Sequence, residues 1–218
     1  MLKFLSFGSG SSGNCYILFT GADCLMIDCG VGIRTLKKHF YNYGLQMSMI
    51  HYILITHDHA DHVKSVGSIS GDLQLPVYAT DGTLQGIRNN WCVRRKIDTK
   101  LTHTINKEEE IQLGEFKVVA FDVPHDSTDC VGYSIEHDGV RFTLVTDCGH
   151  ITEDIAHYIS ISNYLVIEAN HEPEKLAAGP YPRHLKERIS GPNGHLSNEA
   201  CALALVQNAS PLLRHVWL

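Results

Sequence analysis

The sequence predicts an α/β fold in which two β-rich halves with interspersed helices build a sheet-on-sheet core covered by helices. Short apolar segments typical of strands alternate with helical patterns along the whole chain. No repeat, low-complexity tract or linker divides the 218 residues, a length that fits one domain better than two. Hydrophobic residues make up 44% and charged residues 19%, as is typical of globular proteins. We therefore expect residues 1–218 to form a single domain.

In the first half, strands are expected where apolar runs end at turn residues. These runs are 2–7, 15–19, 24–28, 50–56 and 76–79. A helical pattern over 33–43 ends at Gly44, a residue suited to the left-handed conformation that closes helices. Two further helices are expected, near 63–70 and over 82–90.

In the second half, Asp138-Gly139 is a strong hairpin signal between two strand patterns. The strands expected here are 116–123, 130–136, 140–146, 163–168 and 215–218. A helix is expected over 197–208, with Ser197 as its N-cap.

Composition limits the compartment and the partners of the chain. The apolar runs are too short to span a bilayer, and the first ten residues hold no signal-peptide core, so we expect a cytoplasmic protein without a membrane partner. The seven cysteines form no C-x-x-C pair and are expected to be reduced and mostly buried. Cys29 and Cys148 each follow an aspartate, but the histidines already supply ligands, so we do not expect either thiol to bind a metal.

Metal chemistry is indicated by one short run that follows the apolar segment 52–55. It holds His57, His59, Asp61 and His62 within six residues. Three imidazoles and a carboxylate at a strand end suit zinc, manganese or iron, because a rigid strand holds the loop that carries them. A solvent-facing polar turn is the weaker alternative.

Further ligands are expected at other strand ends, since one cluster does not complete two coordination shells. His125 follows the strand pattern 116–121, and Asp147 follows the strand after the hairpin. Alone, either would be a turn or cap residue, but beside the first cluster both are candidate ligands, with Asp147 able to offer one oxygen to each of two ions. His195 lies in a glycine-rich loop before the last helix, where a helix-capping loop is the alternative.

At these residues the chain resembles the metallo-β-lactamase superfamily, through its HxHxDH run, later histidine and strand-end aspartate. Within it, the chain resembles the YycJ (WalJ)-like branch, which is related to ribonuclease Z and ribonuclease J. The finer resemblance covers the chain nearly end to end and depends on segments 8–16, 27–30, 168–171 and 188–198.

The resemblance implies a metallo-β-lactamase αβ/βα four-layer sandwich and two divalent metal ions, zinc or manganese, with iron as a further candidate. It implies six ligands: His57, His59 and His125 on one ion, Asp61 and His62 on the other, and Asp147 bridging both. Asp28 is expected to order the ligand loop from behind, as outer partners of metal ligands commonly do.

This sequence departs from the family pattern at one point. Such families carry a final histidine after the last strand, where this sequence stops at Leu218. Either the sequence is truncated, which we favour and which leaves His195 as a proton donor, or His195 is itself that ligand. If nothing replaces the missing ligand, the second metal is expected to bind weakly.

A dinuclear hydrolase follows from this ligand set. Two ions about 3.5–4 Å apart lower the pKa of a bridging water and withdraw charge from a phosphodiester in its transition state. Asp61 would orient the resulting hydroxide, and His195 would protonate the departing oxygen.

The substrate implied by the resemblance is a phosphodiester, in DNA or RNA acted on from an end. Ser11, Ser12 and Asn14 are candidate donors to a terminal phosphate, with a tight β-turn as the equal alternative. Trp91 and the basic residues 94–96 would stack a base and track a strand, but a solvated basic face is the simpler interpretation.

Two other functions stay open at this point. A hydrolase of a small phosphorylated or ester metabolite would suit the net charge of −6, which gives no general attraction for nucleic acid. A non-catalytic homologue with an incomplete second metal site is the other. The sequence does not predict the oligomeric state.

Overall fold

A computed structural model describes residues 1–218, which cluster into two compact units. Unit 1 comprises residues 1–106, 111–116 and 127–129, and unit 2 comprises residues 107–110, 117–126 and 130–218. The expectation of a single domain stays a prediction. No helix combines the length and apolar character that a membrane crossing requires.

Unit 1 is organised around a six-stranded mixed sheet. Its strands, in spatial order, are β1 (Lys3–Gly8), β2 (Cys15–Phe19), β3 (Cys24–Ile27), β4 (Tyr52–Leu54), β5 (Val77–Ala79) and β6 (Thr102–Thr104). The first three pair antiparallel, and pairing from β3 onward is parallel. β2 and β3 are buried throughout, which explains their unbroken apolar sequences.

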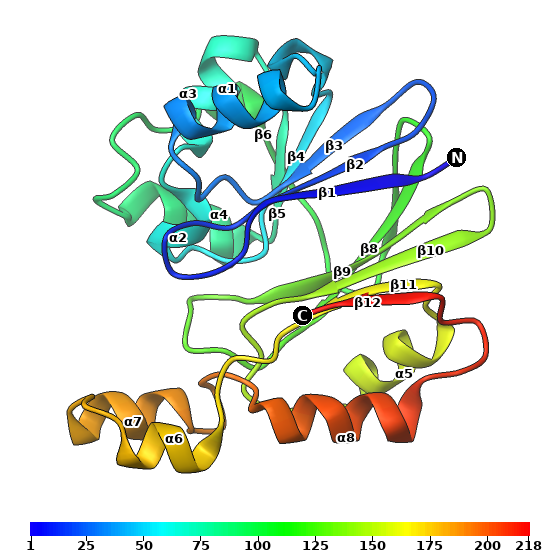
Figure 1. The fold of residues 1–218 in the computed structure, drawn as a ribbon. Helices are drawn as coiled ribbons and strands as arrows, with labels where there is room; N and C mark the ends of the chain where they lie inside the picture. The colour runs from blue at the N-terminus through cyan, green and yellow to red at the C-terminus, as the bar shows by residue number, and fades with distance from the viewer. The chain divides into compact units, whose positions relative to one another are not determined.

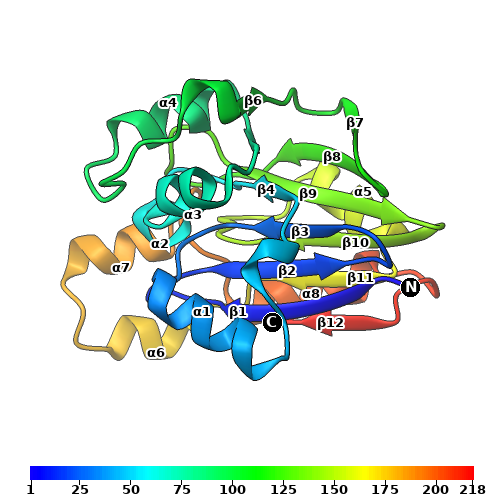
Figure 2. The ribbon, with the colours of Figure 1, turned by 90° about the horizontal axis from the view of Figure 1, so that it is seen from above.

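Helices cover unit 1's sheet (Figures 1 and 2). They are α1 (Ile33–Asn42), α2 (Ala60–Val63), α3 (Val66–Leu73) and α4 (Asp81–Asn89), with 3₁₀ turns at Met47–Met49 and Thr99–Leu101. α1 packs Leu36 and Phe40 into the core, and Ile33 lies partly buried against it. The single helix expected near 63–70 is in fact two, α2 and α3, separated at Ser65, whose hydroxyl donates to the carbonyl of Val31 instead of to helix backbone.

Unit 2 is organised around the second six-stranded mixed sheet. In spatial order the strands of this sheet are β12 (His215–Trp217), β11 (Tyr164–Ile167), β10 (Val140–Val145), β9 (Val131–His137), β8 (Phe116–Asp122) and β7 (Glu110–Leu113), of which β7 falls mostly within residues 111–116 of unit 1. Pairing is antiparallel from β8 to β10 and parallel from β10 to β12. Asp138 and Gly139 both have positive φ, 51° and 72°, as the predicted two-residue hairpin requires.

Two helices of unit 2, α5 (Glu153–Ile161) and α8 (Asn198–Asn208), lie on one face of this sheet and contact each other (Figure 1). α8 begins at Ser197, whose hydroxyl accepts from the backbone N–H of Ala200, so the predicted N-cap is confirmed. Two short helices, α6 (Pro173–Ala178) and α7 (Arg183–Ile189), join β11 to α8.

Polar residues follow the carboxyl ends of parallel strands in both units. In unit 1, Asp28 follows β3 and His57 follows β4; in unit 2, Asp147 follows β10 and Glu168 follows β11. Asp28 and Asp147 both adopt the left-handed conformation, with φ of 61° and 50°. Because this conformation is rare outside glycine, it marks these two turns as places where the side chain matters.

Candidate metal centre

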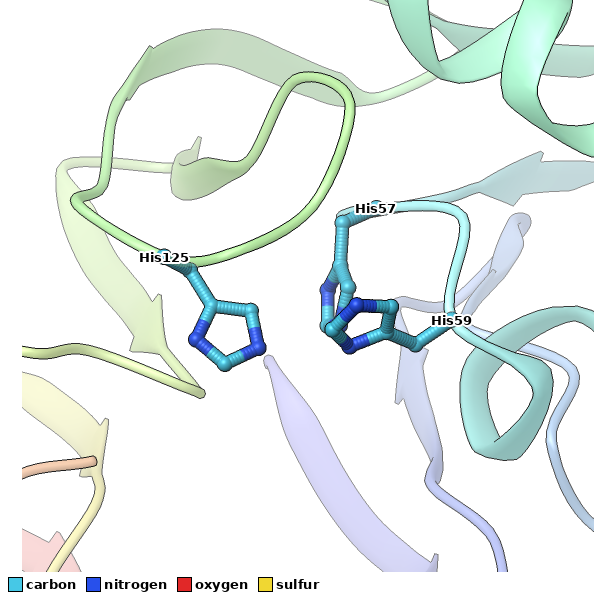
Figure 3. A group of neighbouring side chains, drawn as sticks. All are labelled: His57, His59 and His125. Carbon is cyan, nitrogen blue, oxygen red and sulfur yellow. The ribbon is translucent and has the colours of Figure 1, made fainter. Parts of the chain in front are cut away.

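The first group of metal-capable side chains lies in unit 1, on the loop between β4 and α2. The ring centroids of His57 and His59 are 4.7 Å apart, and those of His57 and His62 are 4.0 Å apart. His57 and His62 are fully buried. Figure 3 shows the rings of His57 and His59 turned toward each other from the two sides of this loop. The structure therefore brings these three predicted ligands together within one unit.

Asp28 organises these imidazoles from behind. Its carboxylate accepts from the Thr56 backbone N–H at 2.9 Å, from the Thr56 hydroxyl at 2.9 Å, and from Nδ1 of His62 at 2.8 Å. With its single hydrogen given to Asp28, the Thr56 hydroxyl accepts from Nδ1 of His57 at 3.0 Å. Both rings therefore carry their hydrogen on Nδ1, so Nε2 holds the lone pair, which is the form of imidazole that binds metals.

Asp61 lies in the first turn of α2, with its side chain 31% exposed. Its carboxylate oxygen is 3.9 Å from Nε2 of His62, so both can approach one ion from the same side. The backbone carbonyl of Asp61 accepts from the N–H of Asn14 at 2.7 Å. Gly30 packs against the same carbonyl so closely that a Cβ there would lie 1.5 Å from the oxygen. The ligand loop is thus held by main-chain contacts as well as by Asp28.

The second group lies in unit 2 and consists of His125, Asp147 and His195, whose ligand atoms lie within 4.8 Å of one another. His125, drawn in Figure 3, is on the loop after β8. Its Nδ1 lies 3.0 Å from the carbonyl of Gly194, and because a carbonyl only accepts, Nδ1 carries the hydrogen and Nε2 the lone pair. The ring centroids of His125 and His195 are 5.2 Å apart.

Glu168 contacts this second group, although the sequence analysis did not single it out. It accepts from Nδ1 of His195 at 2.7 Å, and its other oxygen accepts from the backbone N–H groups of Cys148 and Leu196 at 3.0 and 3.1 Å. Burial lowers the pKa of His195, but the hydrogen bond and charge of Glu168, with Asp147, outweigh burial and raise it above its ordinary value. The signal was present, because Glu168 opens one of the segments that carried the family resemblance.

These donor sets fit divalent metal ions. Each unit offers buried imidazole nitrogens and at least one carboxylate, the ligands that zinc and manganese take from proteins. Outer hydrogen bonds fix the imidazoles, as Asp28 does for His62 and Glu168 for His195. Neither Cys29 nor Cys148 belongs to a group of this kind, and burial raises the pKa of Cys148 to about 12.

The three candidate phosphate donors lie in different surroundings, two exposed and one buried. Ser11 and Ser12 are exposed at the turn before β2. Asn14 is buried, accepts from the N–H of Gly10 at 2.8 Å, and places Nδ2 2.8 Å from Nε2 of His62. The Asn14 side chain thus faces the histidine loop, whereas the two serines face solvent.

Some side chains of the basic stretch have partners within the chain, and others are exposed. Arg95 pairs with Asp72 at 2.5 Å, and Lys96 donates to the backbone carbonyl of Asn90 at 2.7 Å. Arg94 is exposed and makes no ion pair, and Trp91 is 86% exposed. Two of the three basic side chains expected to track a strand therefore serve the local fold.

Comparison with known proteins agrees with this fold and these donors. Residues 24–213 match the β-lactamase superfamily domain, and the chain belongs to that superfamily. Exodeoxyribonuclease YycJ of Bacillus anthracis is 30% identical over 217 residues, which cover 100% of this chain and 81% of that protein. Exodeoxyribonuclease WalJ of Streptococcus pneumoniae is 30% identical over 216 residues, covering 99% of this chain and 80% of that protein.

Among solved structures, Zn²⁺-bound PqqB from Methylobacterium extorquens has a TM-score of 0.77 at 18% identity, covering 96% of this chain and 86% of that one. The predicted fold class and the resemblance to the YycJ (WalJ)-like branch are confirmed. The protein is a metal-dependent hydrolase of this superfamily.

Proposed function

We propose that this protein is a dinuclear metal-dependent exonuclease that releases nucleotides from the end of a DNA strand. The two groups of donors carry the proposal, because imidazoles with fixed Nε2 lone pairs stand beside carboxylates in both units. The similarity along the whole chain to two proteins named exodeoxyribonucleases supports DNA as the substrate. We further propose a cytoplasmic location.

The ligand assignment that we propose is the one that the family resemblance implies. It gives His57, His59 and His125 to one ion, Asp61 and His62 to the other, and Asp147 to both. When bound, two such ions supply a nucleophile at neutral pH and stabilise charge on the phosphoryl oxygens. Asp61 accepts a hydrogen bond from the attacking group and orients it.

His195 completes the reaction by giving a proton to the departing oxygen. Its Nδ1 is held by Glu168 at 2.7 Å, so its ring is oriented and Nε2 is the proton-transferring atom. In the metal-free chain, Glu168 and Asp147 raise the pKa of His195, so the contact that orients the ring also favours its protonated form. If the second ion takes His195 as a ligand instead, this proton must come from another group.

End-labelled DNA and RNA, single- and double-stranded, test the proposal. Each substrate carries a 5′-phosphate or a 5′-hydroxyl and is assayed in manganese or zinc. Asp61→Asn should abolish stepwise release of nucleotides, and the same change at Asp72, an exposed partner of Arg95, should leave it intact. Absence of cleavage by protein that binds two equivalents of metal would overturn the proposal.

Hydrolysis of a small phosphorylated or ester metabolite is the second candidate, favoured by the net charge of −6. Salt separates the two, because polyanion binding weakens steeply with ionic strength and small-molecule turnover does not. A non-catalytic homologue would bind fewer than two ions per chain, which metal analysis measures.

A further inference from the structure

A cavity of about 390 Å³ lies within unit 2, beside the second group of donors. Ala200, Leu203 and Ala204 of α8 line it, and so does His195. Leu203 is 53% exposed and so offers apolar surface to this cavity. A group held in this cavity would therefore have both apolar surface and an imidazole of the proposed site within its walls.

His171 lines this cavity and carries an unsatisfied polar atom. Its Nδ1 is buried and has no hydrogen-bond partner in the chain, although the residue lines the cavity. The backbone that carries this ring is held in place, because the His171 carbonyl accepts from the N–H of Asn198 at 2.8 Å. A buried polar atom without a partner costs about 1–3 kcal/mol, so a ligand toward which the ring turned this nitrogen would recover that cost. Burial lowers the pKa of His171, which agrees with a neutral ring.

Other polar groups of the lining point to a neutral ligand. His150 donates from Nδ1 to the carbonyl of Pro192 at 2.8 Å, so its Nε2 is an acceptor in the neutral ring. The Gln207 amide, on α8, makes no hydrogen bond within the chain. No lysine, arginine, aspartate or glutamate lines the cavity. A phosphate would find no lysine or arginine here, whereas a planar heterocycle would find apolar contact and hydrogen-bonding groups.

We propose that this cavity binds the nucleoside of the terminal nucleotide, with its base against Leu203 and its polar edge bonded to His171. The proposal depends on the exonuclease function above and deepens it by assigning the base subsite. The volume lies at the lower end of the range for small-molecule pockets, about 300–1,000 Å³, which suits one nucleoside and not a stacked run. The adjacent His195 then stands at the phosphodiester that this nucleotide carries.

Two chromogenic esters test the assignment with the whole protein. Thymidine 5′-(p-nitrophenyl phosphate) carries a nucleoside, and bis(p-nitrophenyl) phosphate carries none. Leu203→Ser and His171→Ala should each raise KM for the thymidine ester about tenfold, in line with about 1–3 kcal/mol for one base contact, and change that of the other ester less than twofold. Val206→Ser is the matched control, because Val206 is on the same helix, is 84% exposed and does not line the cavity.

A binding readout makes the test independent of catalysis. Saturation-transfer NMR of thymidine with chelator-treated protein should show magnetisation transfer to the base protons, and Leu203→Ser should reduce it while Val206→Ser should not. Equal effects of the two serine variants, or equal KM changes for the two esters, would overturn the base subsite and leave the nuclease intact. If wild-type protein that binds two metals hydrolysed neither the esters nor DNA, the exonuclease proposal would be refuted instead. Thymidine binding would then decide separately whether the cavity binds a nucleoside.

Discussion

Nδ1 of His62 lies 2.8 Å from Oδ2 of Asp28, and both side chains are fully buried. The carboxylate fixes the hydrogen of the ring on Nδ1, so Nε2 is the metal-binding nitrogen. Asp28→Asn keeps the shape but places a weaker, uncharged partner there, and we expect metal affinity to fall about 10–100-fold. Competition with a chelator measures this, with Asp72→Asn as control. Unchanged affinity would show that Asp28 only supports the turn after β3.

Glu168 is expected to control the protonation of His195. Glu168→Gln keeps an acceptor for the backbone N–H groups of Cys148 and Leu196 but removes the negative charge. The pKa of His195 in metal-free protein should therefore fall, because the interaction that favours its protonated form is lost. NMR titration of the imidazole measures the shift. A pKa that rises or stays constant would contradict this account.

Gly30 is expected to be essential for the ligand loop. A Cβ at this position would meet the carbonyl of Asp61 at 1.5 Å, so Gly30→Ala must displace the backbone that carries Asp61. We expect a loss of about 1–3 kcal/mol in the free energy of unfolding, together with weaker metal binding. Gly32→Ala is the control, because no atom lies within 4 Å of its added Cβ. Denaturant unfolding compares the two, and similar losses would show that local packing does not require Gly30.

One thiol should react far faster than the rest. Cys92 is partly exposed, whereas the other six cysteines are buried. Burial raises the pKa of Cys24 to about 12, so little thiolate forms there near neutral pH. Ellman's reagent should titrate one group in native protein and seven in denaturant, and Cys92→Ser should remove the fast group. Two or more fast thiols would contradict the structure.

Trp91 tests whether the basic stretch contacts substrate. The Asn90 side chain donates to the carbonyl of Asp58 at 2.7 Å, so the residue before this exposed tryptophan is bonded to the histidine loop within unit 1. If it stacks on a base, Trp91→Ala should raise KM for DNA about 5–100-fold, and Trp91→Phe should restore most of the affinity. Equal KM values for wild type and Trp91→Ala would leave a solvated surface as the role of this stretch.

Much of the fold could be predicted because its strands are short apolar runs between turn residues. The position of β2, the hairpin at Asp138 and the cap at Ser197 each depend on neighbours in the sequence. β6, of three residues and mostly exposed, was missed because its pairing with β5 is long-range. α6 and α7 were missed because neither contains a buried residue, so no apolar periodicity marks them.

The site divides in the same way. Four candidate ligands within six residues can be recognised from the sequence alone. Glu168, in contrast, is a single acidic residue whose partner, His195, lies 27 positions away. The inward orientation of Asn14 likewise depends on His62, 48 positions away. Contacts of this length are set by the register of the sheets, which local patterns do not report.

The left-handed turns at Asp28 and Asp147 place two aspartates where glycine would cost the backbone less. Forcing a side chain into this conformation costs about 1–2 kcal/mol at each position. Substitution by glycine should therefore relax both turns while removing the carboxylates on which the proposed chemistry depends. At Asp28 the loss would exceed this gain, because glycine would leave the backbone N–H of Thr56 and Nδ1 of His62 buried without their acceptor. Any programme to stabilise this enzyme by placing glycine at left-handed positions should therefore hold both aspartates constant.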